Sequence, residues 1–191
     1  MRRKENGVVE GSNADLLIFE RTDMGVTPDD FMSRMEKIEE FLKTSKPVFR
    51  CDTISTEKMD SPGETAETYG AHFKIPFMEN RLILNTKYWI PEENLVIISS
   101  EGNKDIREKF MSEHNIQDGR DYIVAMTYIS GYQFRPVYDE HDHTKVIGTH
   151  VIQLAESSFG GGMPQWMVRK GQPKGMIEGY EKLLEEIRKS I

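Results

Sequence analysis

The C-terminal part of the chain carries one apolar stripe at helical spacing, and this stripe constrains the fold more than any other feature. Its members recur every three or four residues and are Met176, Ile177, Tyr180, Leu183, Leu184, Ile187 and Ile191. Charged residues fill most positions between them, which predicts an amphipathic helix with one buried face. We expect this helix to begin near Met163–Pro164 and to be interrupted at Gly171, Pro173 and Gly175. A long helix with one apolar face needs a broad apolar surface to cover.

The preceding segments supply that surface as a series of short strands. Aromatic and β-branched residues between turn residues predict strands over 14–20, 48–58, 65–75, 81–89, 95–100, 121–129, 132–138 and 146–154. Ser130–Gly131 is expected to be the turn between two of them. Helices are predicted over 28–44 and over 103–115. The pattern therefore favours an α+β fold in which a curved antiparallel sheet wraps around the long C-terminal helix, with an internal apolar cavity of several hundred Å³.

Composition indicates one domain of a water-soluble protein. The chain has 191 residues, a formal net charge of −7 and one cysteine, Cys51. The negative charge repels nucleic acid, and a lone cysteine cannot form an internal disulfide, which is typical of a reducing compartment. The longest aliphatic run, Leu95–Ile98, is far shorter than the roughly 20 residues that cross a bilayer. We expect a flexible tail over 1–7, one domain over 8–191, a monomer, a cytoplasmic location and no nucleic-acid partner.

Four stretches, in a fixed order, are similar to those of a known family. Residues 75–84 resemble its proline, short loop and strand-opening arginine, and residues 128–136 resemble a Tyr-x-Ser-Gly-Tyr hairpin that ends in proline. Residues 161–166 resemble a Gly-x-Ile-Pro-x-Trp entry to the last helix, and Thr27–Pro28 opens a helix after a strand. Over residues 8–191 the chain resembles the START domain, the steroidogenic acute regulatory protein-related lipid transfer domain of the helix-grip superfamily. It departs from the family pattern at Leu82, at Ser158 and in the longer excursion over 101–119.

The resemblance implies a non-enzymatic protein that holds one lipid or sterol between the sheet and the last helix. It also implies transfer or sensing of that ligand and transient contact with membranes. The glycines over 160–162 and the interruption over 171–175 lead us to expect a lid, in which the last helix hinges to admit the ligand. Because no phosphate-loop, dinucleotide-binding or zinc-finger pattern is present, we expect no cofactor.

The candidate ligand-binding residues are those that would face the cavity. The resemblance implies basic residues at the positions of Arg81 and Lys87, and Glu67 and His72 are the nearest partners for a buried charge. Two structural alternatives remain: a surface ion pair of Lys87 on the convex face, and a pair of Arg81 that fixes the entry to its strand. The full candidate set is Arg81, Ile83, Asn85, Lys87, Glu67, His72, His150, Met163, Trp166, Met167, Met176 and Tyr180. On periodicity alone, a dry core is the better interpretation of the apolar members of this set, and it is the resemblance that favours a cavity.

Other chemistries receive less support from the sequence. His141 and His143, with His150 further on, have the spacing of metal ligands, but they fall in a charged turn that is better read as a solvated hairpin tip, and no metal is expected. No catalytic residue is expected. Two alternatives stay open: an enzyme of the same superfamily that uses Glu67, His72 or a tyrosine on a small hydrophobic substrate, and a regulatory module that binds a partner through helix 103–115.

Overall fold

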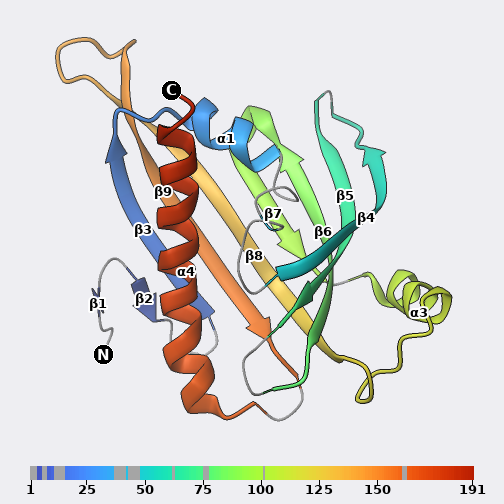
Figure 1. Cartoon of the computed structure of the whole chain (residues 1–191). Coiled ribbons are helices and arrows are strands. Elements are labelled where there is room, and N and C mark those ends of the chain that lie inside the picture. The colour runs from blue at the N-terminus through green and yellow to red at the C-terminus, as the bar shows by residue number, and fades with distance from the viewer. Residues whose placement is uncertain are drawn as a thin grey trace.

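A computed structural model describes residues 4–5, 8–10, 16–36, 42, 48–61, 63–74, 78–100, 102–160 and 163–191. These residues form a nine-stranded sheet and the helices that pack on it (Figure 1). The strands are β1 (Lys4–Glu5), β2 (Val8–Glu10), β3 (Leu16–Met24), β4 (Val48–Lys58), β5 (Thr65–Phe73), β6 (Arg81–Ile90), β7 (Leu95–Ser99), β8 (Ile123–Tyr138) and β9 (Val146–Ser158). The helices are α1 (Pro28–Glu36), the short η1 (Pro91–Glu93), α3 (Lys104–Glu113) and α4 (Gln165–Arg188).

The sheet order is β1-β2-β3-β9-β8-β7-β6-β5-β4. Each strand from β4 to β9 pairs antiparallel with the next, and β3 pairs with β9, which confirms the predicted meander. The start of β8 also pairs parallel with β6. The α+β fold predicted from the sequence, a curved sheet with a long C-terminal helix along it, is the fold observed (Figure 1).

The main core lies where α1 and α4 meet the sheet. Phe31 of α1 stacks on Phe134 of β8 with 4.8 Å between the ring centroids, and Tyr180 of α4 lies 4.9 Å from the ring of Phe19 on β3. The apolar stripe of α4 contributes Met176, Leu183, Leu184 and Ile187, all at most 8% exposed. The prediction of one buried face is thus confirmed from Met176 to Ile187, with Ile177 partly buried, whereas Ile191, the last member of the predicted stripe, is 69% exposed. None of the helices in the described part of the chain is long and apolar enough to cross a membrane.

A smaller core lies on the opposite, outer face of the sheet. Phe110 of α3 is 5% exposed and packs on Leu82 and Leu84 of β6, with Ile106 and Met111 beside it. Both faces of β6 are therefore covered. The apolar stripe of the helix predicted over 103–115 packs against its own sheet, which leaves it little apolar surface for a partner.

The predicted turn at Ser130–Gly131 is wrong. β8 continues through both residues, with a bulge between Thr127 and Ile129. A side chain at Gly131 would place its Cβ 2.6 Å from the carbonyl oxygen of Val96 on β7. Glycine is therefore required here because two strands approach each other closely. The residue pair Ser-Gly is also common in turns, and this is why the sequence predicted a turn.

The predicted interruption of the last helix is also wrong. α4 is a single helix of 24 residues that includes Gly171, Pro173 and Gly175 (Figure 1). Pro173 has no backbone N–H and removes one helical hydrogen bond, but the helix is long enough to continue past it. Gly160, expected to act as a hinge, has φ +63° and lies so close to β8 that a Cβ would stand 2.6 Å from the carbonyl oxygen of Val124. Gly161 and Gly162 lie outside the described residues.

Two further expectations concern the N-terminal part. The sequence predicts a tail over 1–7, yet Lys4–Glu5 forms β1 and pairs with β2. In the helix expected over 28–44, the described residues form α1 as far as Glu36 and are helical again at Leu42. Residues 37–41 and 43–47 lie outside the described residues.

Candidate ligand-binding cavity

A cavity of about 190 Å³ lies between the sheet and the end of α1. Its described lining comes from α1, from Leu42 and from strands β5 to β9, and includes Met35, Tyr69, Ile83 and Tyr132. Ligand pockets of proteins usually have volumes of about 300–1,000 Å³, so this cavity is small for a lipid. It is smaller than the sequence led us to expect, and no described residue of α4 lines it.

Polar side chains of the cavity wall are joined by hydrogen bonds. Asn85 donates to the hydroxyl of Tyr69 at 3.4 Å and accepts from Ser100 at 2.7 Å. Gln153 donates to the hydroxyl of Tyr132 at 2.7 Å. Burial raises the pKa of Tyr132 to about 12 and raises the pKa of Tyr69 further above its usual range. Both phenols are therefore neutral at physiological pH.

Lys87 lies inside the molecule. Its side chain is 3% exposed, its Nζ lies 2.6 Å from a carboxylate oxygen of Glu67, and it donates to the backbone carbonyl of Glu36 at 3.0 Å. Glu67 stands directly opposite Lys87 in the β5–β6 register and is the partner expected from the sequence. The surface ion pair considered as an alternative is therefore wrong. The contacts neutralise the ammonium group and fix the C-terminal end of α1 to the sheet.

Arg81 is fully buried and contacts mainly backbone. Its Nε donates to the carbonyl of Phe159 at 2.9 Å, its Nη1 donates to the carbonyl of Glu79, and the Glu79 carboxylate lies 3.8 Å away. These contacts hold the segment that leads into α4 against the start of β6. These contacts agree with the alternative in which Arg81 fixes the entry to its strand. Ile83 and Asn85, on the same strand, line the cavity as expected.

His72 and His150 do not line the described cavity. His72 is 1% exposed on the outer face of β5, with its ring 5.1 Å from that of Tyr122, and burial lowers its pKa. His150 also lies on the outer face, 3.1 Å from the hydroxyl of Thr22. Because strand residues alternate between faces, Glu67 and His72 point to opposite sides of β5. They cannot act together as an acid–base pair.

The candidate residues of α4 and of the segment that leads into it divide into two groups. Met176 and Tyr180 are buried in the main core, and the Tyr180 hydroxyl donates to the carboxylate of Asp23 on β3. Arg188 lies 3.5 Å from the same carboxylate. Around the start of the helix, Met163 and Met167 are partly exposed and Trp166 is 64% exposed. The structure therefore does not bring the five candidates together around one ligand.

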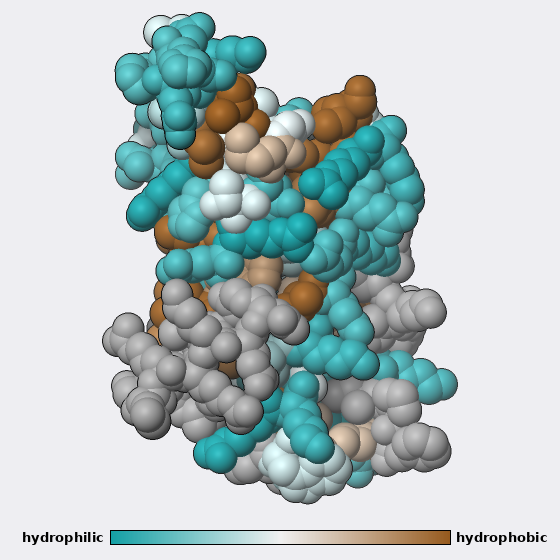
Figure 2. Space-filling view, turned by 90° about the vertical axis from the view of Figure 1, so that its left-hand side faces the viewer, coloured by the Kyte–Doolittle hydropathy of each residue, from teal (hydrophilic) through white to brown (hydrophobic). Residues whose placement is uncertain are grey.

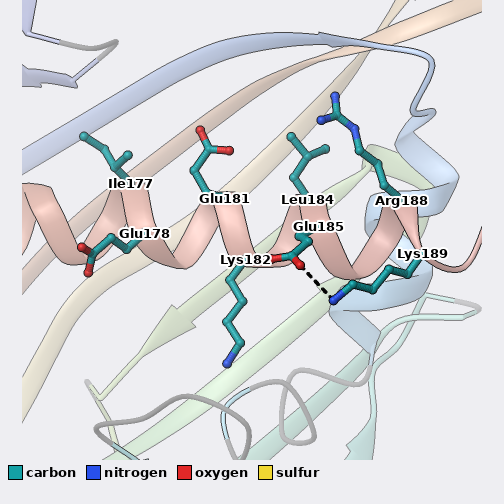
Figure 3. Close-up of a pocket in the computed structure, with 8 residues that line it drawn as sticks. All are labelled: Ile177, Glu178, Glu181, Lys182, Leu184, Glu185, Arg188 and Lys189. Atoms are coloured by element: carbon teal, nitrogen blue, oxygen red, sulfur yellow. Dashed lines mark ion pairs between the residues drawn. The ribbon is translucent and has the colours of Figure 1, made fainter.

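A second hollow, of about 620 Å³, opens along α4 and differs in character from the cavity (Figure 3). Its described lining comes from α4 and from Lys189 directly after it and is mostly charged, with Lys189 held 3.0 Å from Glu185. Exposed ion pairs of this kind contribute about 0–1 kcal/mol, and a charged lining does not favour an apolar molecule. In Figure 2, which shows the face beside β3, most of the coloured surface is hydrophilic, and hydrophobic side chains gather in its upper part, below the β8–β9 hairpin. His141 and His143 are exposed at the tip of that hairpin, as predicted.

Comparison with solved structures identifies the architecture. Human STARD10 is 17% identical, with a TM-score of 0.68 over 96% of this chain and 71% of that chain. Human StAR-related lipid transfer protein 5 is 13% identical, with a TM-score of 0.64 over 98% of this chain and 85% of that one. The chain has a START-like helix-grip fold. This confirms the resemblance stated from the sequence motifs.

A third solved structure of similar fold comes from Thermus thermophilus. TTHA0849 from Thermus thermophilus is 16% identical, with a TM-score of 0.53 over 91% of this chain and 94% of that chain. No family model matches the sequence, and no curated protein is found to match it. At these identities, the START-like similarity establishes the fold, and the function must be argued from the cavity.

Sequence reasoning missed four residues that shape the site: Asp23, Tyr69, Tyr132 and Gln153. All four are polar or aromatic residues within strands, where they read as ordinary members of an alternating pattern. No signal in the sequence pointed to Asp23, because the strand predicted over 14–20 ends before it and an aspartate is seldom buried.

Proposed function

We propose that this protein binds one lipid or sterol molecule in the cavity between the sheet and α1 and exchanges it with membranes, without catalysing a reaction. The observation that carries the proposal is the internal cavity itself, which has mainly apolar walls and lies within a START-like fold. Apolar burial would supply the affinity, at about 0.8 kcal/mol for each buried CH₂ group.

The size of the cavity implies that the wall must move to admit a whole lipid. Residues 163–175 include no buried side chain in the described part of the chain, whereas Met176 and the stripe after it are buried. The second half of α4 is held by the contacts of Tyr180 and Arg188 with Asp23. We propose that the first half of α4 is the gate and that it bends near Pro173, where one helical hydrogen bond is missing.

Native mass spectrometry of the purified protein tests the binding proposal. We expect a co-purified lipid mass, or uptake of a phospholipid, sterol or fatty acid by protein stripped of lipid. Ala71 lines the cavity and is 1% exposed, so Ala71→Leu should reduce uptake by filling part of the volume. Ala66→Leu, on the outer face of the same strand, is the matched control and should leave uptake unchanged. Protein that takes up none of these lipids would show that the proposal is wrong.

A further inference from the structure

Two tyrosines on different strands face the same cavity. Tyr69 comes from β5 and is 2% exposed, and Tyr132 comes from β8 and is partly buried. Each phenol oxygen already accepts a hydrogen bond from an amide, Tyr69 from Asn85 and Tyr132 from Gln153. In the part of the chain that the structure describes, neither hydroxyl donates a hydrogen bond to any acceptor.

In this arrangement each hydroxyl keeps its own hydrogen available for donation. A phenol has one O–H donor, and an amide N–H on its oxygen leaves that donor free to point elsewhere. A buried donor without an acceptor is unfavourable, so a ligand that supplies the acceptor gains affinity. Because burial keeps both phenols protonated, they act as donors and cannot act as bases.

The charges around the cavity further restrict the chemical class of ligand that it can bind. Apart from the two tyrosines, the described lining residues carry no ionisable group. The nearest buried charges, Lys87 and Glu67, satisfy each other at 2.6 Å. A carboxylate, phosphate or ammonium group in the cavity would lose its hydration and find no free counter-charge. Thr127, Ser130 and Ser157 add hydroxyls that can either donate or accept, so they do not discriminate among uncharged groups.

We infer that the cavity selects an apolar ligand with an uncharged carbonyl oxygen, which accepts hydrogen bonds from Tyr69 and Tyr132. A carbonyl oxygen has two lone pairs and brings no hydrogen of its own, so it satisfies two donors at once. The ligand class is therefore a ketone, aldehyde or ester on a hydrocarbon frame. This inference rests on the proposed function, because it names the ligand of the same cavity.

Four compounds with one phenyl ring test the inference on the full chain: acetophenone, 1-phenylethanol, ethylbenzene and benzoate. They are small enough for the present cavity, and calorimetric titration measures their affinities. We expect acetophenone to bind about tenfold more tightly than ethylbenzene, and benzoate to bind most weakly. Tyr69→Phe and Tyr132→Phe should each weaken acetophenone binding by about threefold to tenfold, the usual effect of one hydrogen bond.

The controls separate a lost hydrogen bond from a damaged cavity. Both variants should bind ethylbenzene as the unmodified protein does, which shows that the cavity is intact. Tyr122→Phe removes a hydroxyl on the outer face and should change nothing. In infrared spectra, the carbonyl stretch of bound acetophenone should lie at lower frequency than in hydrocarbon solvent, and the double variant should reverse that shift.

The outcomes distinguish this inference from the proposed function. Equal affinity for ethylbenzene and acetophenone, or tighter binding of 1-phenylethanol or benzoate, would overturn carbonyl selection and leave lipid binding in place. Failure of all four compounds to bind, alongside uptake of a lipid in the mass-spectrometric test, would overturn the inference alone. Failure of both tests would overturn the inference and the proposed function together.

Discussion

His72 lies beneath α3, on the face of the sheet opposite to the cavity. It packs against the rings of Phe110 and Tyr122, and its pKa is lowered by burial first and by the nearby Arg50 second. The neutral imidazole is therefore the form that the folded protein accommodates. Protonation would place a second positive charge beside Arg50, with Asp52 at 3.9 Å as the opposing carboxylate.

This burial predicts a stability change at mildly acidic pH. The folded-state pKa of His72 is below the unfolded value of about 6.5, so the unfolded chain takes up the proton first as the pH falls. The melting temperature should be steady above about pH 7.5 and should fall as the pH decreases from about 6.5. His72→Gln should remove most of this slope between about pH 6.5 and 5, and His141→Gln, at the exposed hairpin tip, should keep it. An unchanged slope in His72→Gln would assign the acid sensitivity to other groups.

Lys87 and Glu67 form an ion pair inside the molecule. Lys87→Met leaves the Glu67 carboxylate, 17% exposed, without its cation, and removes the contact with the end of α1. The free energy of unfolding should fall by about 3–5 kcal/mol, measured by urea denaturation. Combining it with Glu67→Leu should recover much of that loss, because no charge then remains buried. If the double variant is no more stable than Lys87→Met, the pair is not the reason for the loss.

The sequence was sufficient to predict that Lys87 pairs with Glu67. It was not sufficient to predict that Tyr69 and Tyr132 face the cavity. Lys87 and Glu67 are charged residues in neighbouring strands, and burial of one demands the other. Tyr69 and Tyr132 lie in strands with buried or half-buried residues on both faces, so alternation alone does not tell which face turns inward.

At the scale of elements, α4 is one helix with two differently packed halves. Its first half has no buried side chain among the described ones before Met176, and Gly171 and Gly175 face open space where a Cβ would meet nothing within 4 Å. Gly179, in the half that packs on the core, also has room for a Cβ. These three glycines provide matched positions for separating helix stability from gating.

The gating proposal predicts different effects at these glycines. Gly171→Ala and Gly175→Ala, together, should stabilise the first half of α4 by about 1 kcal/mol each and should slow the transfer of a fluorescent lipid between vesicles. Gly179→Ala should give a similar rise in melting temperature without slowing transfer. Equal transfer rates in all variants would mean that ligands enter without bending of the first half of α4.

The order of helices and strands could be predicted from the periodicity of the sequence. Two predicted interruptions, one in β8 and one in α4, were wrong. Ser130–Gly131 has the composition of a turn, yet the glycine serves a close approach to Val96 on β7. Gly171 and Pro173 have the composition of a break, yet the helix continues because packing from Met176 onwards extends it. In both places a contact between distant parts of the chain outweighs the local signal, and a single sequence does not display such contacts.

At the scale of the whole molecule, helices cover both faces of the sheet. α1 and α4 lie on one face, and α3 lies on the other, over β5 and β6 (Figure 1). The β6 wall of the cavity is thus supported from outside by Phe110, and the gating proposal accordingly places widening on the side of α1 and α4. The predicted excursion over 101–119 is therefore a structural support of that wall.

The contact between Tyr180 and Asp23 has a consequence for how the chain acquires its structure. It joins residues 157 positions apart, and β3, which pairs with β2 on one side, gains its other neighbour only when β9, far along the chain, is available. Contacts between such distant residues make folding slow. Until Tyr180 has been synthesised, the apolar side of the sheet has no α4 to cover it, and we expect the nascent chain to present a surface prone to aggregation. The last helix is thus the element whose arrival ends the vulnerable stage of biosynthesis.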